Sequence, residues 1–235
     1  MLILALDTAT AAGSVALVGD DRVRVSRYFD VGLQHSHLLF AEIEQALSLG
    51  ACRAADLDAV AVSIGPGSFT GLRIGLSAAK GLCLAGESAL VVVPTLEALA
   101  GQILYARQPV CALIAARRGE VYAGLYDTSA GHPRALGPAR AVAPDLLVAE
   151  RTGSETIFVG DGVEACRPLL ATCPGALLAP FPCGRSDAVR IGWLGLSRLR
   201  SGQTADLASV EPEYLRTPEY RPAAGPLRPP ARTRW

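Results

Sequence analysis

A glycine-rich stretch, residues 63–86, constrains the fold of this chain more than any other feature. It follows the apolar run 57–64, which is typical of a buried strand. Its first glycines permit the backbone angles and close contacts of a sharp strand-to-helix turn. These are Gly65, Gly67 and Gly71. The stretch therefore predicts a strand, a tight turn and a helix that packs closely against its surroundings.

The predicted helix begins at Ser68 or Thr70, which are both good N-caps, and Gly86 is expected to stop it. Apart from Arg73 and Lys80, its residues are apolar or very small, so we expect burial on more than one side. One face is smooth enough for a second helix, from this chain or from a partner. Its small residues are Gly71, Gly75, Ala78 and Ala85.

A glycine loop that opens a helix can also bind a phosphate group through free backbone N–H groups. The spacing here argues against the known versions. A P-loop needs Gly-Lys-Ser/Thr at the helix start, whereas Gly71 is followed by Leu72 and Arg73, and the dinucleotide fingerprint has one residue fewer before its last glycine. A tight turn with close helix packing is the favoured interpretation.

Composition indicates a soluble globular protein, since half of the 235 residues are apolar and the formal net charge is zero. A balanced charge gives no electrostatic basis for binding nucleic acid unaided. The six cysteines form no Cys-x-x-Cys pair and are expected to be reduced core thiols of a cytosolic protein. Asp7 interrupts the apolar start, so neither a signal peptide nor a membrane span is predicted there.

The order of elements predicts an α/β fold with two ribonuclease-H-like lobes, mixed sheets and helices on the sheet faces. Strands are expected at 2–6, 14–18, 23–25, 57–64 and 90–93, and helices at 36–50, 70–85 and 95–105. The pattern then starts again, with strands at 110–116, 121–126, 139–142 and 157–159 and helices after Pro144 and at 163–170. The position of this second set of strands and helices in the chain fits an internal duplication.

Three regions follow from this order. Residues 1–101 form a first lobe that carries the partner-binding helices, and residues 102–217 form a shorter second lobe. An amphipathic helix over 187–200 ends the second region and is a candidate to pack back on the first lobe. Residues 218–235 are rich in proline and arginine and are expected to be a disordered tail.

Two such lobes with an Asp-Thr-x-Thr turn after the first strand resemble the superfamily of actin, heat-shock chaperones and sugar kinases. Within it, three motifs resemble the bacterial TsaB (YeaZ) family, which takes part in making N6-threonylcarbamoyladenosine in transfer RNA. The motifs begin at Ile3, Gly65 and Arg117, and Glu211-Pro-Glu-Tyr-Leu-Arg216 resembles the carboxy-terminal ending of the family. The resemblance covers residues 1 to about 217.

The resemblance implies a non-catalytic scaffold. TsaB proteins resemble the catalytic protein TsaD, lack its metal site, and form a heterodimer with it through helices of the first lobe. A small ATPase, TsaE, joins the complex, and tRNA is expected to be contacted mainly through the complex. The implied partner interface comprises Leu39, Ile43, Leu47, Phe69, Gly71, Arg73, Gly75, Ala78 and Lys80. For Arg73 and Lys80 a solvated stripe remains an equal alternative, and whether the chain alone forms a homodimer stays open.

No catalytic residue, metal or cofactor is expected. The metal motif of TsaD is His-Leu-Glu-Gly-His, and matched on Leu-Glu this chain has Thr95 and Leu99 in place of the two histidines. His35 and His37 are two residues apart at a helix start and cannot share a face, so solvated or capping histidines are favoured over ligands.

A degenerate nucleotide cleft is the remaining candidate site. In the superfamily, the turn after the first strand and a matching turn in the second lobe clamp ATP. The first turn is intact here, with Asp7, Thr8 and Thr10, but Ala115 stands where relatives commonly carry the second aspartate. Asp7 alone is a poor Mg-nucleotide site and is expected to hydrogen-bond its own turn as an Asx motif. Asp161 and Gly162, where superfamily members contact the nucleoside, stay minor candidates for weak nucleotide binding.

Two other functions are weighed against the scaffold. An ATP-dependent phosphotransferase needs an intact acidic pair at the clamp, and Ala115 counts against it. A metallopeptidase needs clustered histidine or carboxylate ligands, which the sequence pattern does not provide. The fold by itself supports none of the three functions.

Overall fold

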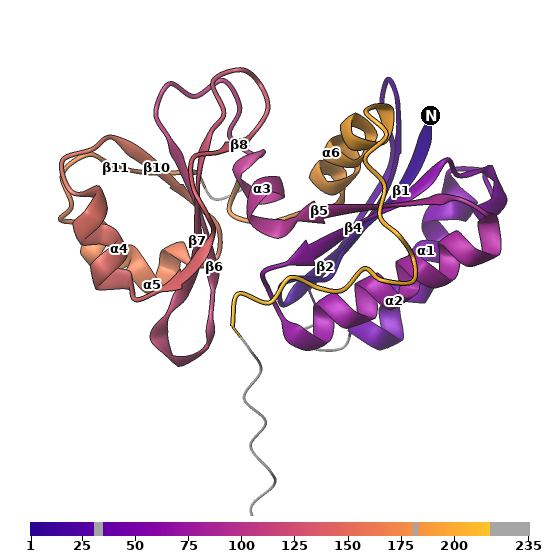
Figure 1. Cartoon of the computed structure of the whole chain (residues 1–235), viewed down its shortest axis with the longest axis horizontal. Helices are drawn as coiled ribbons and strands as arrows, with labels where there is room; N and C mark the ends of the chain where they lie inside the picture. Colours follow the sequence, from indigo (N-terminus) through magenta and orange to yellow (C-terminus); the bar gives the residue numbers. More distant parts are fainter. Residues whose placement is uncertain (31–34, 181–182, 217–235) are drawn as a thin grey trace, which may run out of the picture.

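The computed structural model describes residues 1–30, 35–180 and 183–216. Two lobes lie side by side, each built on one mixed sheet with helices on its faces (Figure 1). The first lobe contains β1 (Leu2–Asp7), β2 (Ala12–Gly19), β3 (Val23–Asp30), α1 (His35–Leu49), η1 (Ala54–Asp56), β4 (Ala59–Gly65), α2 (Phe69–Gly86), β5 (Ala89–Pro94) and α3 (Thr95–Ala100). The remaining elements are β6 (Val110–Ala115), η2 (Arg117–Gly119), β7 (Val121–Asp127), β8 (Arg134–Ala135), β9 (Arg140–Val142), α4 (Pro144–Arg151), β10 (Thr156–Val159), α5 (Val163–Leu170), β11 (Ala176–Leu178) and α6 (Ala188–Arg200).

The two sheets have the same strand order, which confirms the predicted fold class and the repeated pattern. The first runs β3-β2-β1-β4-β5, with the hairpin strands antiparallel and β4 and β5 parallel to β1. In the second, β6 takes the place of β1, β7 that of β2, and β10 and β11 follow in parallel on the other side. The division of the chain at residue 101 stays a prediction.

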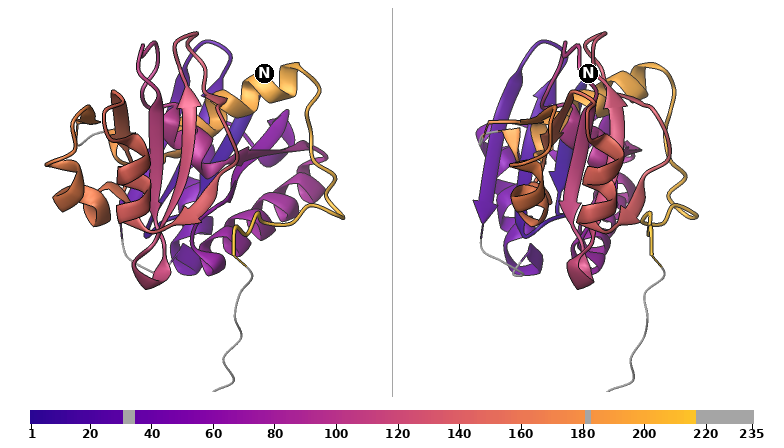
Figure 2. Two further views of the ribbon diagram at one scale, coloured as in Figure 1. Left: turned by 60° about the vertical axis from the view of Figure 1, so that its left-hand side comes forward. Right: turned by 90° about the vertical axis from the view of Figure 1, so that its left-hand side faces the viewer.

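Alternating side chains give the first sheet two buried faces, because successive residues of a strand point to opposite sides. Leu2, Leu4 and Leu6 of β1 lie with α1 and α2 on one face. Ile3 and Ala5 face α6 on the other side. The amphipathic helix at the end of the second region therefore packs back on the first lobe (Figures 1 and 2).

The second sheet is covered by α4 and α5 on one face and by α3 on the other. Leu96 and Leu99 of α3 are buried against residues of β6, β7 and β10, although α3 directly follows the last strand of the first sheet. This helix therefore lies between the two lobes (Figure 1). Its partly buried Glu97 accepts a hydrogen bond of 2.8 Å from Arg198 of α6.

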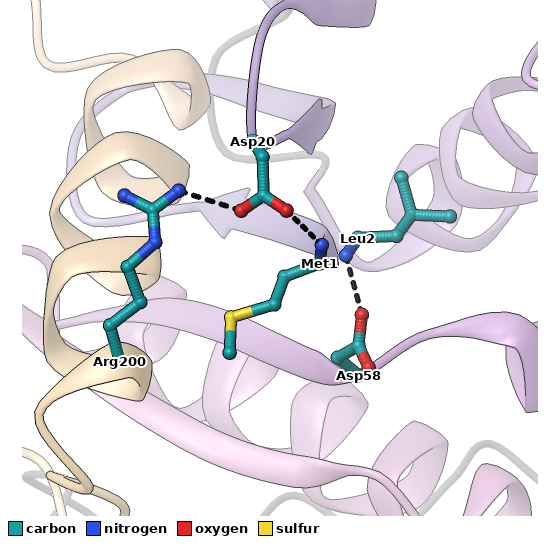
Figure 3. A network of polar contacts seen from close by, with 5 residues as sticks. All are labelled: Met1, Leu2, Asp20, Asp58 and Arg200. Atoms are coloured by element: carbon teal, nitrogen blue, oxygen red, sulfur yellow. Dashed lines mark hydrogen bonds and ion pairs between the residues drawn. The ribbon is translucent and has the colours of Figure 1, made fainter.

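A polar network fixes the far end of α6 to the start of the first sheet (Figure 3). Arg200 donates to Asp20 at 2.6 Å, and the same carboxylate pairs with the α-amino group of Met1. Nearby, the N–H of Leu2 donates to Asp58 at 2.6 Å. The contacts of Asp20 with the amino terminus and with Arg200 both lower the pKa of its carboxyl group, and the hydrogen bond from the amino terminus has the larger effect.

Residues 201–216, here called the strap, leave α6 and return along the first lobe to the space beside the second (Figures 1 and 2). Ala205 pairs with Leu90 of β5, and its N–H donates to the Leu90 carbonyl at 2.8 Å. Leu207 and Val210 pack partly buried against the core between the sheet and α1 and α2. The strap is thus part of the first lobe, although it has no regular secondary structure along most of its length.

Some predicted boundaries were wrong. Helix α2 includes Gly86, and Glu87 caps it in the left-handed conformation, with φ 53°. Helix α3 ends at Ala100 and does not reach residue 105. Ser68 rather than Thr70 is the N-cap of α2, since its side chain accepts from the N–H of Gly71. The predicted tail over 218–235 and the side chains of residues 35–37 lie outside what the structure describes.

The cysteines divide into two groups by their burial. Cys83, Cys111 and Cys166 are buried, and burial raises the pKa of all three thiols, that of Cys111 to about 12. Cys52, Cys173 and Cys183 are half-buried, and burial also raises the pKa of the Cys52 thiol. Among the described residues no helix is long and apolar enough to span a membrane.

Because the cysteines differ in burial, we expect their modification to occur in two phases when the native protein is treated with a thiol reagent at pH 8. Because only the thiolate reacts, and burial raises the pKa of the Cys111 thiol well above 8, this buried group should react only on unfolding. Cys173 and Cys183 should react first. Mass spectrometry of timed samples assigns each thiol, and early modification of Cys111 would contradict the packing of the second lobe.

Candidate functional site

Much of the predicted partner interface is buried inside the chain, which corrects the prediction for those residues. Leu39 and Ile43 of α1 are 0% and 3% exposed and pack in the core on the first sheet. Ala78 of α2 is 3% exposed and belongs to the same cluster. None of these side chains is accessible to a partner, while Leu47 is half-buried at the margin of the cluster.

Gly71 and Gly75 face the turn after β1 rather than a partner. A Cβ on Gly71 would lie 2.0 Å from the carbonyl oxygen of Thr8, and a Cβ on Gly75 would lie 2.3 Å from Thr8 Oγ1. The Thr8 hydroxyl donates to the Gly71 carbonyl at 2.7 Å. This part of the smooth face of α2 therefore allows the helix to approach the β1–β2 turn of its own chain, and the burial of Gly71 and Gly75 contradicts their predicted place in a partner interface.

Phe69 and Arg73 contact the strap. The Arg73 guanidinium lies 3.8 Å from the centre of the Phe69 ring, and its Nε donates to the Tyr214 hydroxyl at 3.0 Å. The rings of Phe69 and Tyr214 are 5.0 Å apart. Lys80 lies near Asp206 of the strap, whose carboxyl has a lowered pKa mainly through the Ser209 hydroxyl, with a contribution from the Lys80 charge.

The outward side of α2 carries a different set of small and apolar residues. Ser77, Gly81 and Ala85 are exposed at intervals of one helical turn, and a Cβ on Gly81 would meet nothing within 4 Å. Leu84 beside them is 70% exposed. On the neighbouring α1, Phe40 and Leu49 are 59% and 68% exposed. These residues of both helices are called the outer helix surface below.

The predicted cleft begins with Asp7, which is 1% exposed. Its carboxylate accepts from the Ser63 hydroxyl at 2.7 Å and from the N–H of Ala9 at 3.1 Å. The second contact confirms the predicted Asx motif. Thr8 is fully buried, and Thr10 donates to the Ala12 carbonyl at 3.2 Å. Asp7 is therefore directed into the first lobe, where its hydrogen bonds hold the turn.

The second-lobe candidates lie together. Asp161 accepts from the N–H of Ala115 at 2.9 Å, and a Cβ on Gly162 would lie 2.9 Å from backbone atoms of Ile114. Asp161 is more than a third exposed, but the protein around it desolvates its carboxyl and raises its pKa, while the bonded backbone N–H groups oppose this effect. Its position is set by the backbone of β6.

A small cavity of about 150 Å³ joins the two halves of the cleft. Thr10 and Asp161 both line it, so these two predicted residues are brought together from opposite lobes, whereas Asp7 and Thr8 are buried behind the turn. Tyr28 and Arg185 line it too, and Arg185 donates to the Tyr28 hydroxyl at 2.8 Å. Typical small-molecule sites are about 300–1,000 Å³, so this cavity is smaller than such sites.

No group of three or more histidine, cysteine or acidic side chains is placed to hold a metal ion within the described residues. Thr95 and Leu99, which stand in the places of the TsaD histidines, are buried in the interior, at 0% and 1% exposure. Neither side chain offers a nitrogen ligand. The arrangement therefore provides no protein-based metal centre at this helix.

Comparison with known proteins identifies the family. The family model described as TsaD, tRNA N6-adenosine threonylcarbamoyltransferase, matches residues 30–220. The tRNA threonylcarbamoyladenosine biosynthesis protein TsaB of Escherichia coli is 33% identical over 92% of this chain and 95% of its own length. This chain belongs to the TsaB family. The TsaB protein of Bacillus subtilis is 26% identical over 93% of the chain and 96% of its own length.

The solved structures agree with this assignment. YeaZ from Pseudomonas aeruginosa superposes with a TM-score of 0.78 at 28% identity, covering 91% of this TsaB-family chain and 99% of the other.

The packing of Tyr214 on α2 was not predicted from the sequence. The Glu-Tyr-Leu-Arg ending, which was noted only as a family resemblance, was the available signal.

Proposed function

We propose that this chain is the accessory, non-catalytic subunit for threonylcarbamoyl transfer to the adenosine next to the anticodon of tRNA. Its membership of the TsaB family supports a role in threonylcarbamoyladenosine synthesis. The catalytic subunit is a TsaD-type protein with which it forms a heterodimer. A TsaE-type ATPase joins them in the cytoplasm, and tRNA is bound mainly by the complex.

The residues of the cleft support the proposal that the subunit is non-catalytic. Its first-lobe carboxylate, Asp7, is buried and accepts hydrogen bonds from Ser63 and Ala9. Ala115 supplies no second carboxylate, and the remaining cavity of about 150 Å³ is smaller than typical small-molecule sites. Phosphoryl transfer requires a positioned metal and nucleotide, which these groups are not arranged to bind.

The outer helix surface supports the proposed heterodimer. The exposed backbone at Gly81 lets a partner helix approach closely, and Leu84 and Phe40 offer apolar area to bury. Charged groups are few along this stripe of α2, as is typical of the centre of an interface. A second copy of the chain could use the same surface in the absence of the partner, which gives a homodimer.

The test uses the purified chain alone and with its TsaD-type partner. We expect no ATP hydrolysis and no stoichiometric metal in the chain by itself, and a one-to-one complex on mixing. Elemental analysis, a phosphate-release assay and sedimentation give these results. One equivalent of bound zinc or iron would contradict the proposal. So would ATP turnover that is lost in the Asp7→Ala variant.

A further inference from the structure

The strap binds the glycine-rich turn between β4 and α2. The N–H of Glu213 donates to the Ile64 carbonyl at 2.8 Å, which ties the strap to the backbone of β4 near its end. Gly65, with φ +127°, is shaped for this contact, since a Cβ there would lie 2.4 Å from the Glu213 carbonyl oxygen. On its other side the same turn contacts the β1–β2 turn, because a Cβ on Gly67 would lie 2.3 Å from the Ala9 carbonyl.

The next residue of the strap docks on the first turn of α2. Tyr214 packs against Phe69 and accepts from Arg73, so an aromatic ring and a cation hold it from the same helix. Such contacts are worth more than a hydrogen bond alone, because the ring also buries apolar area. The position of the strap is therefore coupled to that of α2.

The end of the strap then crosses to the second lobe. Arg216 pairs with Glu120, which directly precedes β7. The other carboxylate oxygen of Glu120 is buried and has no hydrogen-bond partner among the described residues. A partly buried carboxylate is stabilised by a nearby cation. The Arg216 guanidinium therefore stabilises Glu120 of the second lobe when the end of the strap lies beside it. The contact joins parts of the chain that are 96 residues apart.

We propose that the strap is a latch between the lobes. Docking of Tyr214 on α2 places Arg216 against Glu120, and this pair fixes the second lobe relative to the first. Release of the strap from α2 removes the tie and lets the lobes change their angle about the connection between α3 and β6. The latch needs no partner protein, so it stands or falls independently of the proposed function.

The experiment measures the distance between spin labels at two exposed positions, Gln45 on α1 and Asp145 on α4. Labels carried by non-natural residues leave the native cysteines unchanged. The wild-type chain should give one narrow distribution. Glu120→Arg and Arg216→Glu should each broaden it, because each places like charges against each other. The double variant Glu120→Arg/Arg216→Glu should restore the narrow distribution.

A second variant tests the coupling to α2. Tyr214→Ala should broaden the same distribution and raise hydrogen exchange at the Glu213 amide several-fold. Arg134→Glu, which breaks the Arg134–Asp127 pair within the second lobe, is the matched control and should leave the distribution narrow. Single reversals that leave the distribution unchanged, a double variant that stays broad, or an equal effect of Arg134→Glu would each overturn the latch.

Discussion

Replacing Gly71 by alanine is expected to lower the stability of the chain by about 3 kcal/mol. The new methyl carbon would be built 2.0 Å from the Thr8 carbonyl oxygen, which is a backbone atom and cannot turn aside. Helix α2 or the β1–β2 turn must shift, and the hydrogen bond from Thr8 to Gly71 is lost. For a chain of this size the change corresponds to a fall in melting temperature of about 10 °C.

Gly81→Ala is the matched control on the same helix. A Cβ there meets nothing within 4 Å, and alanine is the better helix former by up to about 1 kcal/mol. Its melting temperature should stay equal or rise. Calorimetry of both variants measures the contrast, and a Gly71→Ala chain as stable as the wild type would show that α2 does not approach Thr8 this closely.

A charged residue on the outer helix surface is expected to weaken the complex without unfolding the subunit. Gly81→Glu places a carboxylate in the centre of the proposed contact, where burial without a partner costs about 3 kcal/mol, or about a hundred-fold in affinity. In the free chain the same side chain extends into open space. Calorimetric titration with the TsaD-type subunit measures affinity, and thermal melting measures stability.

Ala78→Glu is expected to destabilise the subunit itself rather than to weaken binding. Ala78 is 3% exposed within the first-lobe core, so a carboxylate there should unfold the subunit before any effect on binding can appear. Leu76 is 5% exposed, so Leu76→Glu should act in the same way. If the Ala78→Glu chain folds but fails to bind, the interface lies on the face of α2 that carries Ala78, and the packing of Ala78 in the core is contradicted.

The positions of the strands and the repeat of their pattern could be predicted from sequence because their signals are local. Apolar runs such as 2–6 and 57–64 and the turns between them specify strands without reference to the rest of the chain. The orientation of α2 could not be predicted in this way. Its residues are small or apolar nearly all round, so a helical wheel does not distinguish the side that meets Thr8 from the side that carries Gly81.

The strap could not be predicted either, since its contacts are mostly made by the backbone or over long distances in sequence. Glu213 binds Ile64 through its N–H, and Ala205 binds Leu90 in the same way, and neither contact depends on side-chain pattern. The contact of Arg73 with Tyr214 was therefore not predicted, although the exposed position of Arg73 agrees with the solvated alternative. In the cleft, the sequence did predict the Asx turn at Asp7, because that hydrogen bond joins residues two apart.

Reconstituted tRNA modification tests the central claim most directly. A mixture of the TsaD-type and TsaE-type proteins, threonylcarbamoyl adenylate, ATP and unmodified tRNA is assayed for threonylcarbamoyladenosine with and without this chain. We predict that product forms only when the chain is present, that Asp7→Asn supports it as long as the chain stays folded, and that Gly81→Glu reduces it in line with its loss of binding. Full product formation without the chain, or with Gly81→Glu at concentrations where it does not bind, would contradict the account.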